Sequence, residues 1–219
     1  SKPVIYTVKA ENGSIKQYTV SVTLLMKPTV FVGSHDNYLY AIDALSGKLF
    51  WKFKTNGEVV SSPTLSKGIV YVGSSDGNIY AIDAFKGTKI WSYSLRGNVY
   101  SPIVVNDVVY VAVENYVFAI DAKTGNKLWS TNFYPSGYIL SSNIEFIRST
   151  PTYYNGVIYI GSWDKKLYAL DAKSGLVKWT FVPSADGDFL SNPVIKDAII
   201  YFGVGKTFYA VDANTGKSN

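Results

Sequence analysis

The sequence predicts an all-β fold, a β-propeller of four-stranded antiparallel blades, and two observations support this prediction. A motif ending in Asp-Ala recurs five times, with Asp43, Asp83, Asp121, Asp171 and Asp212 separated by 40, 38, 50 and 41 residues. This spacing suits a four-stranded blade, which needs about 40–50 residues. Between these positions, short β-branched or aromatic runs are bounded by Gly, Asn, Asp or Ser, as expected of strands. No segment keeps a 3.6-residue period, so we expect almost no helix.

The N-terminal segment, residues 1–28, lacks the repeated motif and is predicted to form a β-hairpin. Its strands are Val4–Ala10 and Ile15–Leu24. A three-residue loop at 12–14 would place Val8 opposite Tyr18, Tyr6 opposite Val20 and Val4 opposite Val22, with the large apolar groups on one face.

A strand count offers another interpretation of the same segment. Blade 1 lacks an obvious first strand and blade 5 lacks its last, since three residues follow Gly216. Val4–Ala10 could complete blade 5 and Tyr18–Leu24 could complete blade 1, giving a closed five-bladed ring without exposed edges. We favour this closed ring slightly over the alternative, a fragment of a larger propeller.

Each predicted blade of the region 29–219 can be followed in blade 2. Strand A carries Pro63, strand B is Ile69–Gly73, strand C is Asn78–Asp83 and strand D is Thr88–Tyr93. Pro63 suits an inner strand whose free edge faces the axis, because proline has no N–H to donate. The other copies place Pro102, Pro151 and Pro193 at the same point.

Two residue types of the repeat have structural explanations. The five Asp residues are predicted to accept backbone N–H groups in the C-to-D turn, where the following Gly adopts a left-handed conformation. The strand-D tryptophans are large enough to fill the gap between blades. They are Trp51, Trp91, Trp129 and Trp179.

The recurrence of Tyr-Ala-Ile-Asp-Ala-x-x-Gly, followed by Trp, resembles the pyrroloquinoline-quinone-like repeat family of β-propellers. The resemblance covers residues 30–217. The family includes quinoprotein dehydrogenases, a propeller lipoprotein of bacterial outer-membrane protein assembly, and cell-surface sensor or adhesion modules. The N-terminal hairpin resembles the last hairpin of bacterial cadherin-like or immunoglobulin-like sandwich domains, which implies a secreted or surface protein.

Composition excludes several classes of protein. With 47% apolar and 17% charged residues the chain is not disordered. It has no Cys, so disulfides and thiolate metal sites are impossible. The net charge of +5 comes from scattered residues, which favours a solvated surface over nucleic-acid binding. No apolar run approaches the roughly 18 residues of a membrane span. The chain begins at Ser1 without a signal sequence, which favours a processed or excised protein.

An insertion is the clearest departure from the repeat. Trp129 and Pro151 are 22 positions apart, whereas Trp91 and Pro102 are 11 apart. The insertion 131–148 and the B-to-C loops should share one face of the propeller, which makes this face the candidate binding surface. Its candidate residues are Trp163, Tyr134, Tyr138, Phe146, His35, Asp36, Tyr116 and Phe189. Alternatively, the insertion folds over the junction of blades 3 and 4 and buries its own apolar side chains.

The sequence offers no catalytic, metal or cofactor residues. His35 is the only histidine, and Ser34-His35-Asp36 is better explained as a solvated loop than as a triad, because Ser34 occupies a repeat position. The vicinal disulfide usual in quinoprotein dehydrogenases is impossible without Cys. We therefore expect a non-catalytic module that binds a protein partner outside the cytoplasm. The alternatives are a carbohydrate-binding module, using the same aromatics, and a quinone-dependent dehydrogenase.

Overall fold

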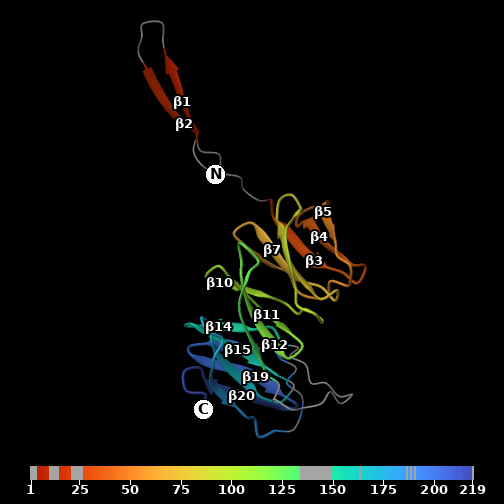
Figure 1. Cartoon of the computed structure of the whole chain (residues 1–219), viewed down its shortest axis with the longest axis vertical. Coiled ribbons are helices and arrows are strands. Elements are labelled where there is room, and N and C mark those ends of the chain that lie inside the picture. The colour runs from red at the N-terminus through yellow and green to blue at the C-terminus, as the bar shows by residue number, and fades with distance from the viewer. Residues whose placement is uncertain are drawn as a thin grey trace.

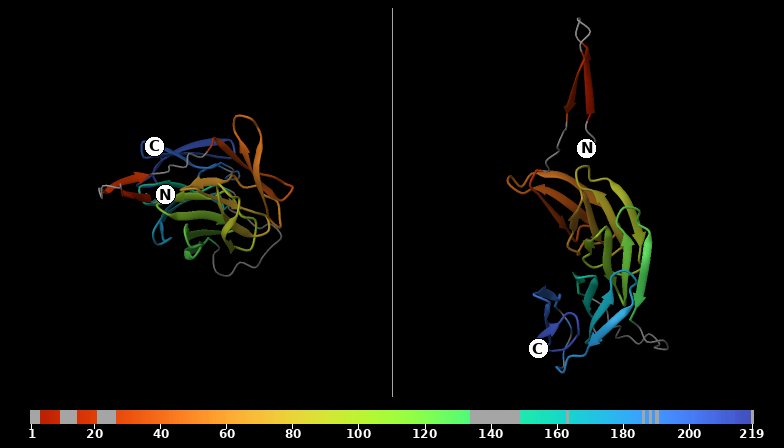
Figure 2. Two further views of the ribbon diagram at one scale, coloured as in Figure 1. Left: turned by 90° about the horizontal axis from the view of Figure 1, so that it is seen from above. Right: turned by 90° about the vertical axis from the view of Figure 1, so that its left-hand side faces the viewer.

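The computed structural model describes residues 4–9, 15–20, 27–133, 149–162, 164–185, 187, 189 and 191–218. Within these ranges the chain forms a row of five antiparallel sheets, each with three or four strands in chain order, and no helix (Figure 1). The five sheets are the blades predicted from the repeat, so the expected all-β propeller fold is confirmed. The blades follow one another along a curve whose ends are blade 1, in orange, and blade 5, in blue (Figure 2).

The strands of each blade fall close to the predicted positions. Blade 1 consists of β3 (Thr29–Gly33), β4 (Tyr38–Asp43) and β5 (Leu49–Lys54), and blade 2 of β6 (Thr64–Ser66), β7 (Ile69–Gly73), β8 (Asn78–Asp83) and β9 (Lys89–Ser94). Blade 3 consists of β10 (Ile103–Val105), β11 (Val108–Val113), β12 (Tyr116–Asp121) and β13 (Lys127–Asn132). Blade 4 consists of β14 (Thr152–Tyr154), β15 (Val157–Gly161), β16 (Leu167–Asp171) and β17 (Val177–Phe181), and blade 5 of β18 (Val194–Lys196), β19 (Ile199–Val204) and β20 (Thr207–Asp212).

The short first strands lie innermost, because β6 contacts β10 and β14 contacts β18 across blade boundaries. The repeated prolines were expected on these strands, but Pro63 lies one residue before β6. A residue without an N–H cannot take part in the ladder, so the paired strand begins after it. The preceding serines hold the inner end together. The Ser61 hydroxyl both donates to the Gly73 carbonyl and accepts the Gly73 N–H, each at 2.8 Å.

The Asp-Ala-x-x-Gly turns form as predicted. Asp83 Oδ1 accepts the N–H groups of Phe85 at 2.9 Å and Lys86 at 2.8 Å. Gly87 donates its N–H to the Asp83 carbonyl and has a φ of 66°, which favours glycine. The same pair of side-chain bonds recurs at Asp43, Asp121, Asp171 and Asp212.

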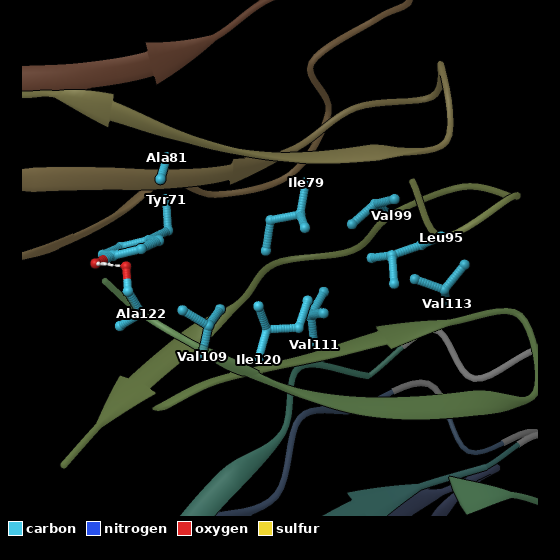
Figure 3. Close-up of a cluster of buried hydrophobic side chains, with 10 residues drawn as sticks. All are labelled: Tyr71, Ile79, Ala81, Leu95, Val99, Val109, Val111, Val113, Ile120 and Ala122. Carbon is cyan, nitrogen blue, oxygen red and sulfur yellow. Dashed lines mark hydrogen bonds between the residues drawn. The ribbon is translucent and has the colours of Figure 1, made fainter. Parts of the chain in front are cut away.

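The tryptophans of strand D join neighbouring blades, as predicted. The Trp91 indole N–H donates to the carbonyl of Ala122 in blade 3 at 3.0 Å. The Tyr71 hydroxyl donates to the same carbonyl, also at 3.0 Å (Figure 3). Gly125 lies against the indole so closely that a Cβ there would be 2.8 Å from Trp91 Cδ2. Each joint therefore consists of an indole seated on the turn of the next blade.

The hydrophobic core is divided among these junctions. Between blades 2 and 3, Ile79 of β8 packs with Val111 of β11 and Ile120 of β12, all fully buried (Figure 3). Leu95 and Val99, from the loop between the two blades, close one end of the same cluster. Because both faces of β7 and β11 are covered by neighbouring blades, these strands are almost continuously apolar instead of alternating.

The two described strands of the N-terminal segment pair with each other. β1 (Val4–Lys9) pairs with β2 (Ile15–Val20) in a separate two-stranded sheet, and among the described residues neither strand joins blade 1 or blade 5. The assignment of these segments to two different blades is therefore wrong, because a direct hairpin satisfies their backbone groups with the shortest loop closure.

The register of the hairpin also differs from the prediction. Val4 lies opposite Val20, and Tyr6 opposite Tyr18, two residues from the predicted pairs. Because side chains alternate with a period of two, a shift of two residues leaves the same residues on each face. The apolar pattern therefore cannot distinguish these two registers.

We expect the Asp turns to make stability sensitive to acid. Hydrogen bonds from the residue three positions on, Ser46, Thr124, Ser174 or Thr215, are the largest cause that lowers the pKa of Asp43, Asp121, Asp171 and Asp212 respectively. A lowered pKa means that the fold favours the carboxylate. This stabilisation is present above the usual Asp pKa of about 3.9. It is lost as the pH falls through the lower pKa of the folded state. Urea unfolding should therefore show a free energy that declines below about pH 4.

The matched control is Asp121→Asn, which keeps an acceptor oxygen but does not titrate. Its unfolding free energy should decline less steeply below about pH 4 than that of the unsubstituted chain. Equal slopes would show that this turn does not contribute to the acid sensitivity.

Candidate functional site

The candidate surface is the loop face, which we define as the B-to-C loops together with the D-to-A loops that connect successive blades. Backbone bonds tie the two sets of loops together. Val59 donates its N–H to the Ser34 carbonyl at 3.0 Å, and Ser75 donates to the Glu58 carbonyl at 2.8 Å. The predicted sharing of one face by these loops is therefore confirmed where the structure describes them.

His35 lies on this face with an exposed side chain. Its Nδ1 is 2.9 Å from Glu58 Oε2, a contact between blade 1's B-to-C loop and the loop leading to blade 2. Exposed pairs of this kind contribute little to stability. Ser34 Oγ accepts the Asp36 N–H at 3.3 Å, so Ser34 serves the turn, as the loop interpretation predicts.

Asp36 is a residue of the scaffold, although we predicted it as a binding residue. Its carboxylate accepts the Tyr38 N–H at 3.1 Å and the Tyr40 hydroxyl. The same tie recurs in two other blades, where Asp76 accepts the Tyr80 hydroxyl at 2.6 Å and Asp164 accepts the Tyr168 hydroxyl at 2.5 Å.

These hydrogen bonds also shift the pKa values of the Asp and Tyr side chains that form them. The hydroxyl of Tyr40 lowers the pKa of Asp36, whereas burial and then the Asp164 bond raise the pKa of Tyr168. Sequence reasoning missed this set of residues, but an Asp four residues before a Tyr in three blades was the signal that could have revealed it.

Phe189 was predicted on the exposed face and this prediction is wrong. The side chain is fully buried, with its ring stacked on Phe202 at a centroid distance of 5.0 Å. It fills the place that Val59 and Val99 take at earlier joints, against the B-strand glycine, here Gly161. Phe189, in the loop before blade 5, lies directly over Gly161, and this contact buries its ring.

Tyr116 keeps its predicted place on the loop face. It begins β12, its side chain is exposed, and its ring lies 5.7 Å from that of Phe118. Together, Tyr116 and His35 are the predicted residues that the structure describes as exposed and not used by the repeat scaffold.

Four predicted residues, Trp163, Tyr134, Tyr138 and Phe146, lie outside the described residues. The structure does describe their neighbours. Phe133, near the start of the insertion, packs its ring 4.5 Å from that of Tyr168. Ser149, which follows it, is buried and bonds both backbone groups of Gly161, donating to the carbonyl at 2.8 Å and accepting the N–H at 3.0 Å. Both ends of the insertion are therefore fixed to the hairpin of blade 4, β15–β16, whose loop contains residue 163.

The described residues do not fit the metal that a quinone site uses. No three or more His, Cys, Asp or Glu side chains gather there in a group that could hold an ion. The recurring Asp residues are engaged in their turns, and at the inner end of the blades Thr64 Oγ1 donates to the Pro102 carbonyl at 2.6 Å. We therefore derive no step through a quinone.

Among the residues that the structure describes, no helix is long and apolar enough to span a membrane.

Five blades that each contain the same kind of Asp turn, and that are joined by the same kind of Trp contact, define a β-propeller of pyrroloquinoline-quinone-like repeats. A family model described as outer membrane protein assembly factor BamB matches residues 10–219. The chain belongs to this family.

Solved structures with the same fold include proteins of different activities. BamB from Moraxella catarrhalis aligns with a TM-score of 0.75 and 18% identity, over 95% of this chain and 67% of that one. The quinohemoprotein alcohol dehydrogenase ADHIIG from Pseudomonas putida HK5 aligns with a TM-score of 0.73 and 21% identity, over 89% of this chain and 40% of that one. At these identities the likeness shows the fold alone.

A curated relative matches over a short stretch. The beta-alanine-activating enzyme of Danio rerio is 44% identical over 43 residues, which is 20% of this chain and 4% of that protein. The chain thus spans a small part of this relative and less than half of the dehydrogenase.

Proposed function

We propose that the chain is a non-catalytic scaffold that binds a protein partner outside the cytoplasm through its loop face. The observation that carries the proposal is the anchoring of both ends of the insertion, at Phe133 and Ser149, to the hairpin that leads into the loop containing Trp163. The sequence between these two anchors, together with residue 163, is the part of the chain richest in aromatics outside the repeat. Exposed aromatic groups supply much of the binding energy at protein interfaces.

The family supports the class of partner and the location. Its description names an assembly factor for outer membrane proteins, which implies contacts with other proteins on the outer side of the inner membrane. In the described residues, the junctions between blades are filled by Trp, Tyr and aliphatic residues of the repeat together with loop aromatics such as Phe133 and Phe189. Residues free of this structural role are available for recognition.

The test is the double variant Trp163→Ala and Tyr138→Ala, with partners captured from an extracytoplasmic extract and identified by mass spectrometry. We expect loss of the partners that the unsubstituted chain captures, with an unchanged unfolding midpoint. The matched control is Leu128→Ala, an exposed side chain on the outer strand β13, which should leave capture intact. Unchanged partners in the double variant would argue against the proposal. Binding on a glycan array that the double variant loses would favour the carbohydrate alternative.

A further inference from the structure

Lysines that are scattered along the sequence gather at one end of the blades. In an antiparallel blade the A-to-B and C-to-D turns lie at the same end, opposite the loop face. The two turns of a blade are bonded to each other, since Ala84 donates its N–H to the Gly68 carbonyl and Ala122 to the Asp107 carbonyl, each at 2.9 Å. We call this end the turn face. In blades 2–4 its exposed lysines are Lys67, Lys86, Lys89, Lys123, Lys127 and Lys173.

The turn face of these internal blades carries an excess of positive charge. With Lys178, near the start of β17, there are seven lysines against four aspartates, namely the three turn aspartates and Asp107. Asp107 forms an ion pair with Lys67. Among the described residues, no ion pair holds Lys86, Lys123 or Lys173.

The loop face of the same blades has no such excess. Its described loops carry three basic and four acidic side chains, which are Arg96, Lys165, Lys166, Glu58, Asp76, Glu114 and Asp164. Blades 2–4 are therefore polarised, with net positive charge at the turn face and a small negative charge at the loop face.

Two large apolar side chains stand among the lysines of the turn face. Phe85 is 49% exposed and Leu176 is 71% exposed. The repeat does not require an apolar residue at either position, because Lys123 takes the place of Phe85 in blade 3 and Asn126 takes the place of Leu176. Both side chains are therefore dispensable to the turn and exposed to whatever approaches this face.

The joints between blades hold these side chains on one rigid surface. The Trp91 indole donates to the Ala122 carbonyl and the Trp129 indole to the Ala172 carbonyl, each at 3.0 Å, so every C-to-D turn is bonded to the blade before it. A surface that is already ordered loses little conformational entropy when it binds.

We propose that the turn face of blades 2–4 binds the surface of an anionic phospholipid membrane. Lysines attract the anionic headgroups, and the exposed Phe85 and Leu176 side chains enter the apolar boundary beneath them. A protein partner fits this face less well, because protein interfaces are depleted of lysine and have a contiguous apolar core, whereas here two apolar groups stand apart among lysines. Since the loop face lies at the opposite end, one chain can contact a membrane and a partner together.

The first experiment is co-sedimentation of the whole chain with vesicles. We expect binding to vesicles that contain phosphatidylglycerol and none to vesicles of phosphatidylcholine alone. Raising the salt concentration from about 0.1 M to about 1 M should release the chain, because the screening length falls from about 10 Å to about 3 Å.

The charge is tested by the triple variant Lys86→Glu, Lys123→Glu and Lys173→Glu. It should bind phosphatidylglycerol vesicles at least about a hundredfold more weakly, since each lysine near an anionic surface contributes about fivefold. The matched control is the triple variant Lys54→Glu, Arg96→Glu and Lys206→Glu, which makes the same change in net charge with exposed residues at the loop end. This control should keep most of the binding.

The apolar contact is tested by Phe85→Asn with Leu176→Asn. Other blades already hold asparagine at these positions, Asn214 and Asn126, so the turns should form and the unfolding midpoint should stay unchanged. We expect binding about tenfold weaker, from the loss of apolar area buried in the bilayer.

Three outcomes would overturn the proposal. The first is a lack of binding to phosphatidylglycerol vesicles at low salt. The second is an equal loss in the two triple variants, which would mean that overall charge and not the turn face attracts the vesicles. The third is binding to polyglutamate without binding to vesicles, which would assign the face to an acidic protein.

Discussion

Trp91→Ala should lower the free energy of unfolding by about 3–5 kcal/mol, the range for removing a large aromatic side chain from a packed site. The indole is seated on Gly125 of the next blade, its N–H donates to the Ala122 carbonyl at 3.0 Å, and the Tyr71 ring lies 5.9 Å away. Alanine would leave a cavity at the joint between blades 2 and 3. Urea unfolding monitored by circular dichroism measures the loss.

Trp91→Phe separates the two contributions of the indole. Phenylalanine keeps most of the apolar contact but cannot donate to Ala122, whose carbonyl still accepts the Tyr71 hydroxyl. We expect a loss of about 1–2 kcal/mol, from one hydrogen bond and some packing. If Trp91→Ala costs less than about 1 kcal/mol, the tryptophan does not hold the blades together.

Gly125→Ala should destabilise the chain by about 2–5 kcal/mol, and Gly47→Ala by about 1–2 kcal/mol. Both glycines end the same turn with almost the same backbone, φ 75° and φ 70°, so alanine carries the same left-handed strain at each. They differ in what lies above them. A Cβ at Gly125 would be 2.8 Å from Trp91, whereas a Cβ at Gly47 would meet nothing within 4 Å.

The difference between these two variants isolates the cost of overlap with the indole. Chemical denaturation of the two variants and of the unsubstituted chain measures the two losses. Equal losses at the two positions would mean that the indole moves aside freely, and that the joint is less rigid than its geometry indicates.

The fold could be predicted from the sequence because the same strand and turn pattern recurs five times. The bounds of β7 and β8 agree with the prediction, and so do the Asp turns and the Trp joints. Local chemistry decides these features. An Asp that can reach the N–H groups two and three residues on, followed by a Gly at positive φ, forms the same turn wherever it occurs.

The candidate site was less predictable because a loop residue can either contact the scaffold or stay exposed. Sequence position alone does not separate these two roles. Asp36 and Phe189 both fall on loops, but the structure assigns one to a bond with Tyr40 and the other to a stack on Phe202. Tyr116, at the start of β12, and His35, in a loop of the same face, stay exposed. Burial depends on which blade lies opposite, and this is a tertiary property.

By itself, the sequence determined the class of fold, the turn chemistry and the residues that join one blade to the next, because all of these depend on residues within one repeat or its neighbour. Only the tertiary structure decided how the N-terminal strands pair and which loop side chains are buried. Hairpin registers two residues apart have the same apolar pattern, so the pattern alone cannot choose between them. Phe189 is buried against Gly161 whereas Tyr116 stays exposed, because burial depends on how the blades and their loops pack in space.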